Sequence, residues 1–326
     1  MDKLSAFSLV KGKYQYQGIF GIKKEQFEKL FDHFYNLYKE ETLKRYEERK
    51  KVYSSSDNGL TARLKYIQEE RLRQYLHVTI YYLRHYPTLE VLGWEIGKTK
   101  QEACEIVHQW FVLLIKSLDN CKVLPARDLK HVARVAENLL GDGVIDDEEL
   151  DLIIDVTERH INRPKKNQKA YYSGKKKHHS IKNTIISTTC AVVLFLGATH
   201  NGSVHDFTML KEDCPKEQMS DNELFMNGML WVDLGYQGIL DFYKDLDIAI
   251  PYKKPRKSKK NPNPELTQEQ KDYNSYVGRN RIRVEHSIGG IKISRIASHK
   301  FRGRKDGWND DVMFAVTALY NYKKIY

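Results

Sequence analysis

The stretch "GMLWVDLGYQGIL", residues 228–240, places one acid directly after a short apolar run and directly before a glycine-containing turn. The run from Met229 to Val232 indicates a buried strand, and Asp233 stands where that strand ends. An acid in this position either caps the following turn or helix, or binds a metal at the carboxyl end of a sheet. Other acids in the same setting are needed to choose between these roles.

Asp155 in "LIIDVTE" has the same setting, because it follows three apolar residues where a predicted strand ends. Strand ends of this kind gather at one place in open α/β sheets. Two carboxylates 4 Å apart repel each other by ~1–4 kcal/mol at effective dielectric constants of about 80 to 20. A shared proton or a hard divalent cation offsets that repulsion. In a basic chain without cysteine ligands, oxygen-bound Mg²⁺ or Mn²⁺ is the natural candidate.

A third acid lies on a predicted helix near the end of the chain, in "GRNRIRVEHSIGGIKISR". Arg281, Glu285 and Lys292 are spaced so that they share one helical face. A helix that needs only ordinary salt bridges has the same pattern. However, Gly289 and Gly290 weaken the helix by ~1 kcal/mol each relative to alanine. The paired glycines therefore favour a close approach to the backbone beside Glu285.

Further segments surround these acids: "DVTERHINRP", "YYSGKKKHH", "GSVHDFTML", "VDLGYQG" and "RVEHSIGGIK". With them, the chain resembles the DDE transposases of the Insertion Sequence Five group and their eukaryotic Harbinger relatives. The resemblance covers most of residues 60–326, and Asp155, Asp233 and Glu285 match the Asp-Asp-Glu triad in order. One departure is that the wider insertion-sequence signature has a tyrosine three residues before the arginine, where this chain has Gly278.

The resemblance implies a ribonuclease-H-like mixed sheet with flanking helices in residues 121–326. It implies that the three acids hold two Mg²⁺ ions, which Mn²⁺ can replace, about 3.5–4 Å apart. The enzyme would bind the terminal inverted repeats of a double-stranded DNA element, cleave its ends and join the 3′-hydroxyl to target DNA. His205 and Asp206 would support the site. Cations expected to contact the DNA backbone are Arg281, Lys292, Lys175, Lys176 and Lys177.

Residues 1–120 are predicted to be helical. Aromatic and apolar residues recur at helical spacing in 23–53, a loop is expected at 54–59, and a second helix at 60–85 ends before Pro87. Thr88 then caps a short helix at 89–96, and Thr99 caps a longer one after Gly97. This pattern, near 88–116, is typical of a helix-turn-helix, although any αα-hairpin shares it. Base-reading residues are expected at the start of the longer helix: Lys98, Lys100 and Gln101.

Residues 121–326 change to an α/β order. Strands are predicted at 150–164, 178–189 and 190–200. A helix at 205–214, a strand at 229–237, a helix at 239–246, a strand at 247–254 and a long helix from Thr267 follow. This order predicts an α/β domain with one mixed sheet. The basic, proline-bearing segment 253–266 is expected to be a solvated loop.

The bulk composition narrows the class of protein. The chain of 326 residues has a formal net charge of +11, which favours a nucleic acid partner over a basic housekeeping enzyme. The four cysteines are scattered, which is typical of a reducing compartment. No apolar run approaches ~20 residues and no signal peptide is evident. We therefore expect a cytoplasmic bacterial protein that acts at the nucleoid, and no membrane partner.

Two patterns imitate metal sites. The segment "GDGVIDDEEL", residues 141–150, is similar to half of a calcium-binding loop, but Leu140 would occupy a ligand position, so an acidic surface turn is the better interpretation. Five histidines near the predicted strands lack the fixed spacing of a zinc site: His160, His178, His179, His200 and His205.

Three functions fit the sequence. The first is a transposase, which we expect to act as a homodimer because an element has two ends. The second is a related nuclease that cuts DNA without joining it. The third is a domesticated DNA-binding protein without catalysis, which the presence of all three acids disfavours.

Overall fold

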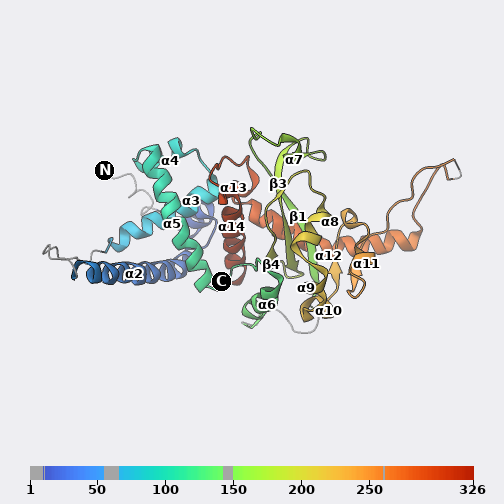
Figure 1. The fold of residues 1–326 in the computed structure, drawn as a ribbon, viewed down its shortest axis with the longest axis horizontal. Coiled ribbons are helices and arrows are strands. Elements are labelled where there is room, and N and C mark those ends of the chain that lie inside the picture. The colour runs from blue at the N-terminus through green and yellow to red at the C-terminus, as the bar shows by residue number, and fades with distance from the viewer. Residues whose placement is uncertain (1–9, 11, 55–65, 142–149, 260) are drawn as a thin grey trace. The chain divides into compact units, whose positions relative to one another are not determined.

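A computed structural model of the chain describes residues 10, 12–54, 66–141, 150–259 and 261–326 (Figure 1). The chain divides into two compact units. The N-terminal unit comprises residues 1–122 with 294–296 and 326, and the C-terminal unit comprises residues 123–293 with 297–325. Three predicted features fall outside the described residues in whole or large part: the loop after Ser54, the start of the helix at 60–85 and the segment 141–150.

The N-terminal unit consists of helices α1 (Lys13–Phe20), α2 (Lys24–Ser54), α3 (Glu69–His85), α4 (Leu89–Ile96) and α5 (Lys100–Asn120). The predicted helix at 23–53 and the predicted helix end before Pro87 are confirmed. The aromatic face of α2 forms part of the core, where Phe27 and Phe34 are fully buried. His77 of α3 stacks on Phe27 with ring centroids 4.1 Å apart. Burial of its ring lowers the pKa of His77 to about 3, so this histidine is neutral.

Helix α4 begins and ends where the sequence predicts, and α5 begins where it predicts. The Thr88 hydroxyl accepts a hydrogen bond from the Val91 N–H (3.2 Å), and Gly97 ends α4 in the left-handed conformation. Thr99 and Glu102 form a reciprocal capping box at the start of α5. None of the described helices is both long and apolar enough to cross a membrane.

The C-terminal unit contains a seven-stranded mixed sheet in the order β2-β3-β1-β6-β7, with β4 and β5 also paired to β3. β1 pairs antiparallel with β3 over its whole length, and β1, β6 and β7 are parallel neighbours. The predicted mixed sheet is therefore confirmed. Its strands are β1 (Leu152–His160), β2 (Tyr172–Ser173), β3 (His178–Thr188), β4 (Val193–Leu196), β5 (His200–Asn201), β6 (Leu230–Trp231) and β7 (Ile248–Ala249).

Several strands are shorter than predicted. The predicted strand at 229–237 ends at Trp231, and residues Leu234–Tyr236 form a single 3₁₀ turn, η3. The predicted strand at 247–254 ends at Ala249, shortly before Pro251, which lacks a backbone N–H for the sheet. The predicted strand at 190–200 divides into β4 and β5.

The helices of the C-terminal unit are mostly short: η2 (Leu129–His131), α6 (Val132–Leu140), α7 (Gln168–Tyr171), α8 (Asp206–Asp213), α9 (Lys216–Ser220), α10 (Glu223–Asn227), α11 (Ile239–Phe242), α12 (Gln268–Lys292) and α14 (Trp308–Ile325). The chain also forms α13 (Arg295–Ser298). Leu152 and Ile154, on one face of β1, pack in a single apolar cluster with residues of α6, α8, α9 and α10. The long helix α12 contacts β1, β3 and β6, which brings its side chains to the carboxyl end of β6.

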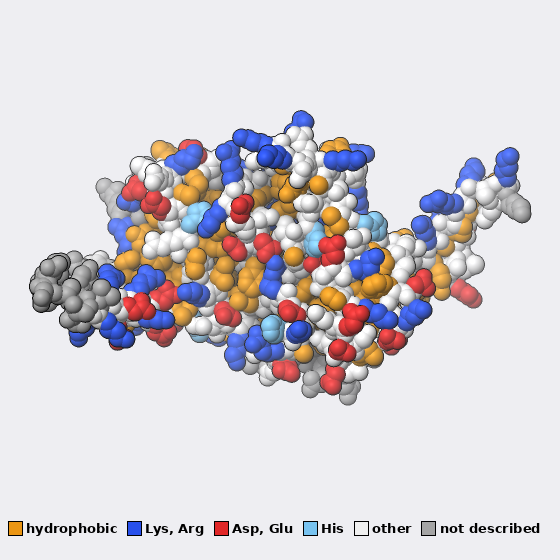
Figure 2. Space-filling view, in the orientation of Figure 1, with side chains coloured by type: hydrophobic (Ala, Val, Ile, Leu, Met, Phe, Trp, Pro, Cys, Tyr) orange, Lys and Arg blue, Asp and Glu red, His pale blue; other side chains and the backbone are white. Residues whose placement is uncertain are grey.

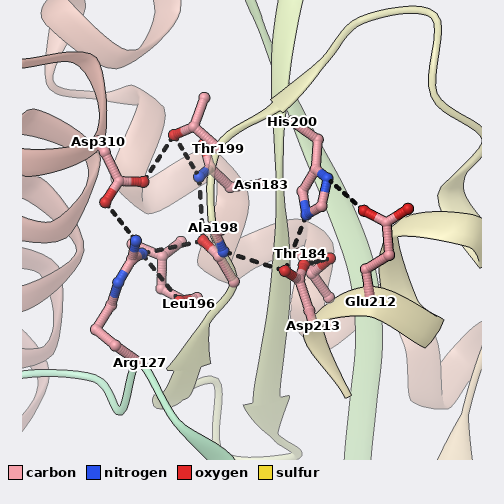
Figure 3. A network of polar contacts seen from close by, with 11 residues as sticks. Arg127, Asn183, Thr184, Leu196, Ala198, Thr199, His200, Glu212, Asp213 and Asp310 are labelled. Carbon is pink, nitrogen blue, oxygen red and sulfur yellow. Dashed lines mark hydrogen bonds and ion pairs between the residues drawn. The ribbon is translucent and has the colours of Figure 1, made fainter. Parts of the chain in front are cut away.

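A polar network ties the sheet to helices α8 and α14 (Figure 3). Arg127 donates to the backbone carbonyls of Leu196, the last residue of β4, and Gly197, and it pairs with Asp310 of α14. Asp213, at the end of α8, accepts from the Thr184 hydroxyl of β3 (2.6 Å) and lies 2.9 Å from the ring of His200. Because these bonds join β3 to helices on different segments, they fix the position of this central strand.

Candidate active site

Asp155 of β1 lies at the same level as Asp233, which follows the end of the parallel neighbour β6. β1 and β6 pair with Ile153 opposite Trp231, and each aspartate comes two residues further along its chain. The sequence placed Asp155 at the end of its strand, and that expectation is wrong, because β1 continues to His160 against β3. Since β6 stops pairing at Trp231, Asp155 lies just past the point where β1 and β6 separate.

Arg281 of α12 lies between the two aspartates. Its Nη2 atom is 3.6 Å from a carboxylate oxygen of Asp155, and its Nη1 atom is 3.3 Å from one of Asp233. The Arg281 side chain is only 13% exposed, so solvent screens these contacts less than it would at the surface. The guanidinium therefore offsets the repulsion that the sequence predicts between the two carboxylates.

Glu285 lines the same cavity as the aspartates. It is exposed and follows Arg281 by one helical turn on the same face of α12. The cavity has a volume of about 600 Å³, and its charged and histidine lining is Asp155, Glu158, Asp206, Asp233, Glu285, Lys175, Lys176, Lys182, Arg281, Lys292, His160 and His178. In the part of the chain that the structure describes, no three acidic, histidine or cysteine side chains come close enough to surround one ion. Glu285 thus shares the cavity without joining the aspartate pair.

The two predicted supporting residues, His205 and Asp206, lie in different environments. Asp206 lines the cavity and pairs with Lys182 of β3, whose Nζ atom is 2.9 Å away. Lys182 also donates to the Val204 carbonyl (2.9 Å) and is 12% exposed. His205 is exposed and caps α8, because its Nδ1 atom accepts from the Phe207 N–H (3.3 Å). Asp206 therefore belongs to the cavity and His205 to the helix end.

The predicted DNA-contacting lysines differ in position. Lys175 and Lys176, in the turn between β2 and β3, are exposed and line the cavity. Lys177 follows them with a positive φ of 59° and is absent from the cavity lining. Lys292 lines the cavity from α12, and burial together with nearby Lys176 lowers its pKa. Three of the four lysines thus border the acids.

Comparison with known proteins identifies the family to which the chain belongs. Residues 154–321, which include all three acids, match the family described as "DDE superfamily endonuclease". The chain belongs to the DDE superfamily of endonucleases. A curated relative from Microchaete diplosiphon, "Probable transposase for insertion sequence element IS702", is 31% identical over 249 residues, which cover 76% of this chain and 78% of the relative. No solved structure matches the chain.

The side chains of this DDE endonuclease suit a hard divalent cation. Asp155, Asp233 and Glu285 offer only carboxylate oxygens, the donors that Mg²⁺ and Mn²⁺ prefer. Burial raises the pKa of Asp155, while the Val156 N–H and Arg281 act in the opposite direction. The buried Tyr236 hydroxyl has no hydrogen-bond partner among the described residues, and Asp155 is among the charges that raise its pKa. A hydrated ion or a phosphate beside Asp155 would supply such a partner.

Two glycines of the endonuclease are required by the geometry near the acids. A Cβ atom on Gly290 would lie 2.2 Å from the Tyr320 ring of α14, so the expected close approach to the helix backbone is confirmed at this position. The approaching group is a tyrosine of the same unit. A Cβ on Gly289 would meet nothing within 4 Å. After Asp233, Gly238 has a φ of 90°, which favours glycine, whereas Gly235 leaves only an ordinary contact with Asp206.

The predicted base-reading residues in the N-terminal unit of the endonuclease are exposed and paired with acids. Lys100 lies 2.5 Å from Glu90 of α4 and Lys98 lies 3.5 Å from Glu102. Gln101 donates to Glu105 one turn further along α5 (3.2 Å). Their exposure permits contact with a partner, and a partner would have to compete with these acids.

Sequence reasoning missed four residues that line the cavity of the endonuclease: Glu158, His160, His178 and Lys182. Lys182 has a sequence signal, because no other residue of β3 is a lysine, an arginine or an acid. His160 and His178 lie with ring centroids 4.2 Å apart, and this pairing depends on the register between β1 and β3. That register cannot be obtained from one sequence without the turn geometry.

Proposed function

We propose that the chain is a DNA transposase of the Insertion Sequence Five group, with a ribonuclease-H-like catalytic domain. The main observation that supports this is the placement of Asp155 and Asp233 at one level, where the parallel strands β1 and β6 separate, with Glu285 in the same cavity. The similarity to a probable insertion-sequence transposase supports it independently. Its place of action would be the bacterial nucleoid.

Asp155, Asp233 and Glu285 would hold two Mg²⁺ ions, or Mn²⁺ in their place. When bound, such ions activate a water molecule and stabilise the leaving 3′ oxygen of a phosphodiester. The protein binds the phosphates on either side of the cut through Lys175, Lys176 and Lys292, which border the acids. Phosphoryl transfer depends mainly on this positioning and on charge neutralisation, because the protein forms no covalent bond to DNA.

Arg281 would have two successive partners. Before ions bind, its guanidinium balances the charges of Asp155 and Asp233. Divalent ions would replace that positive charge, and the released guanidinium would then contact a phosphate oxygen of the substrate DNA. Lys182 holds the Asp206 carboxylate within the cavity during both states.

The N-terminal helices would recognise the element ends. Helices α4 and α5 would act as the helix-turn-helix, with Lys98, Lys100 and Gln101 at the start of the second helix facing the bases. Because an element has two ends that are joined together, we propose a homodimer on DNA.

The experiment that tests this function uses purified full-length protein, labelled element ends, a target plasmid and MgCl₂. The expected result is end cleavage followed by a joined end–plasmid product. Cut ends without joined product would show a nuclease, and retention without cutting would show a DNA-binding protein.

Substitutions of the acids identify the residues responsible. Asp155→Asn, Asp233→Asn and Glu285→Gln should each lower the cleavage rate by about 10²–10³-fold, the scale seen when one electrostatic contact to a transition state is removed. Binding of the element end, measured by gel shift, should change little. Glu212→Gln is a matched control, because Glu212 is an exposed acid of the same unit outside the cavity. A variant that still cuts at the normal rate removes that residue from the site.

A further inference from the structure

Residues 251–259 and 261–266 form an extended arm between β7 and α12. In Figure 1 this segment projects well away from the sheet of its own unit, and Figure 2 shows blue side chains along it. The sequence 253–260 contains six cations in eight residues. The structure describes five of them, and all five are exposed: Lys253, Lys254, Arg256, Lys257 and Lys259.

The base of the arm is fixed to α12. The Tyr252 N–H donates to the side-chain oxygen of Asn274 (2.7 Å), and the Asn274 amide donates back to the Tyr252 carbonyl (3.0 Å). Asn274 thus pairs with the backbone as a neighbouring strand would. The Tyr252 and Tyr273 rings pack edge to face with centroids 5.2 Å apart. These contacts set the direction in which the arm leaves the domain.

Backbone hydrogen bonds hold the far end of the arm together. Ser258 and Asn261 exchange two backbone hydrogen bonds of 3.0 and 3.1 Å. Pro255, Pro262 and Pro264 fix φ on both sides of these bonds. Because its base and far end are already held, the arm loses less conformational entropy on binding than a free chain of the same length.

The charges of the arm favour a polyanion as its partner. The sequence contains no acid between Asp247 and Glu265, and no ion pair is found for the five described cations in the part of the chain that the structure covers. Cations held this close repel one another, and phosphates relieve that repulsion while counterions leave the DNA. We propose that the arm binds the backbone of double-stranded DNA through phosphate contacts, without reading sequence. This inference rests on the proposed function, since the DNA is the substrate of the cavity.

The place of contact follows from the length of α12. Fourteen residues separate Thr267, which caps α12 next to the arm, from Arg281 in the cavity. At a rise of ~1.5 Å per residue, Thr267 is about 21 Å along the helix from Arg281, and Asn274, which holds the start of the arm, is about 10 Å from it. For DNA that runs along α12, at ~3.4 Å per base pair, the arm would contact the duplex about three to six or more base pairs from the cut.

The test measures the dissociation constant of full-length protein for a metal-free, 30-base-pair duplex without terminal repeats, at several NaCl concentrations. Changing the five described cations to glutamine should lower the slope of log Kd against log salt by about 0.9 for each phosphate that the arm no longer neutralises. An equal slope for this variant and the wild type would overturn the proposal. The arm is exposed, so we expect an unchanged Tm.

Two control variants separate charge from shape. Changing Lys253, Lys254, Lys257 and Lys259 to arginine keeps the charge and should keep the wild-type slope. The second control changes three exposed cations of the same unit outside the cavity to glutamine: Lys130, Arg134 and Lys244. This variant should also keep the wild-type slope. If the slope falls as much in this second control as in the arm variant, the effect is a general effect of charge, and the proposal that the arm binds DNA is overturned. The experiment measures DNA binding and not cleavage, so its result tests the arm even if the proposed catalysis fails.

Discussion

At the scale of single residues, only part of the environment of Arg281 in the cavity could be predicted from the sequence. Its position on the Glu285 face of one helix follows from spacing, but its partners do not. Those partners come from two strands whose register brings Asp155 and Asp233 together. The arginine therefore connects the charge of the helix to the acids of the sheet.

Arg281→Gln should lower stability and strengthen metal binding. Removing the guanidinium leaves two carboxylates facing each other, at a cost of about 1–2 kcal/mol, less than the ~3–5 kcal/mol of a fully buried pair because the Asp233 side chain is 45% exposed. We expect a lower Tm in EDTA and a several-fold lower dissociation constant for Mn²⁺, measured by calorimetry. Arg279→Gln, an exposed neighbour on α12, is the control. Equal Mn²⁺ affinity in wild type and Arg281→Gln would contradict the view that Arg281 and the metal ion compete for the two aspartates.

His77 should make the stability of the chain depend on acid. Burial lowers its pKa from 6.5 to about 3, so the unfolded chain takes up a proton that the folded core excludes. The stabilisation is complete above pH ~6.5 and is lost as the pH falls towards 3. Between pH 7 and pH 5 the loss is about 2 kcal/mol, at 1.36 kcal/mol per pH unit.

His77→Phe keeps the stack on Phe27 and removes the titrating group. Its free energy of unfolding, measured with urea, should fall less between pH 7 and pH 5 than that of the wild type. The same loss in both proteins would show that other groups cause it.

At the scale of elements, periodicity and caps predicted α2, α3, α4, α5 and α12 but missed α1, α6 and α14, and the pairing of strands across the sheet could not be predicted from the sequence. Thr88, Thr99 and Thr267 cap helices where the pattern of polar and apolar residues begins. The strands β6 and β7 are only two residues long, and their ends are set by neighbours rather than by propensity. Asp206 and Lys182 meet for the same reason, since their contact joins β3 to α8.

The two glycines of α12 provide a matched test of helix packing. Gly290→Ala should destabilise the protein by about 1–3 kcal/mol, because the added methyl group meets the Tyr320 ring. Gly289→Ala has open space and should be neutral or stabilise by up to ~1 kcal/mol through helix propensity. Thermal unfolding measures both, at about 2–4 °C per kcal/mol. Equal shifts for the two variants would contradict the packing of α12 on α14.

At the scale of the whole molecule, the net charge and the positions of the acids are the features of the sequence that indicate function. The net charge of +11 predicted a polyanion partner, and six of the cations lie in the arm segment 253–260. The sequence made the three acids candidates because each stands at a change of pattern, after an apolar run or on a charged helical face. It could not show that Arg281 lies between two of them, since that depends on how α12 crosses the sheet.

The most direct measurement is a crystal structure of the full chain with a cleaved element end and Mn²⁺, with the ions located by anomalous scattering. We expect Mn²⁺ bound by the carboxylates of Asp155 and Asp233, with Glu285 drawn in to a second ion and Arg281 turned towards a phosphate. Anomalous peaks elsewhere, with Arg281 still paired to both aspartates beside bound DNA, would contradict the proposed site.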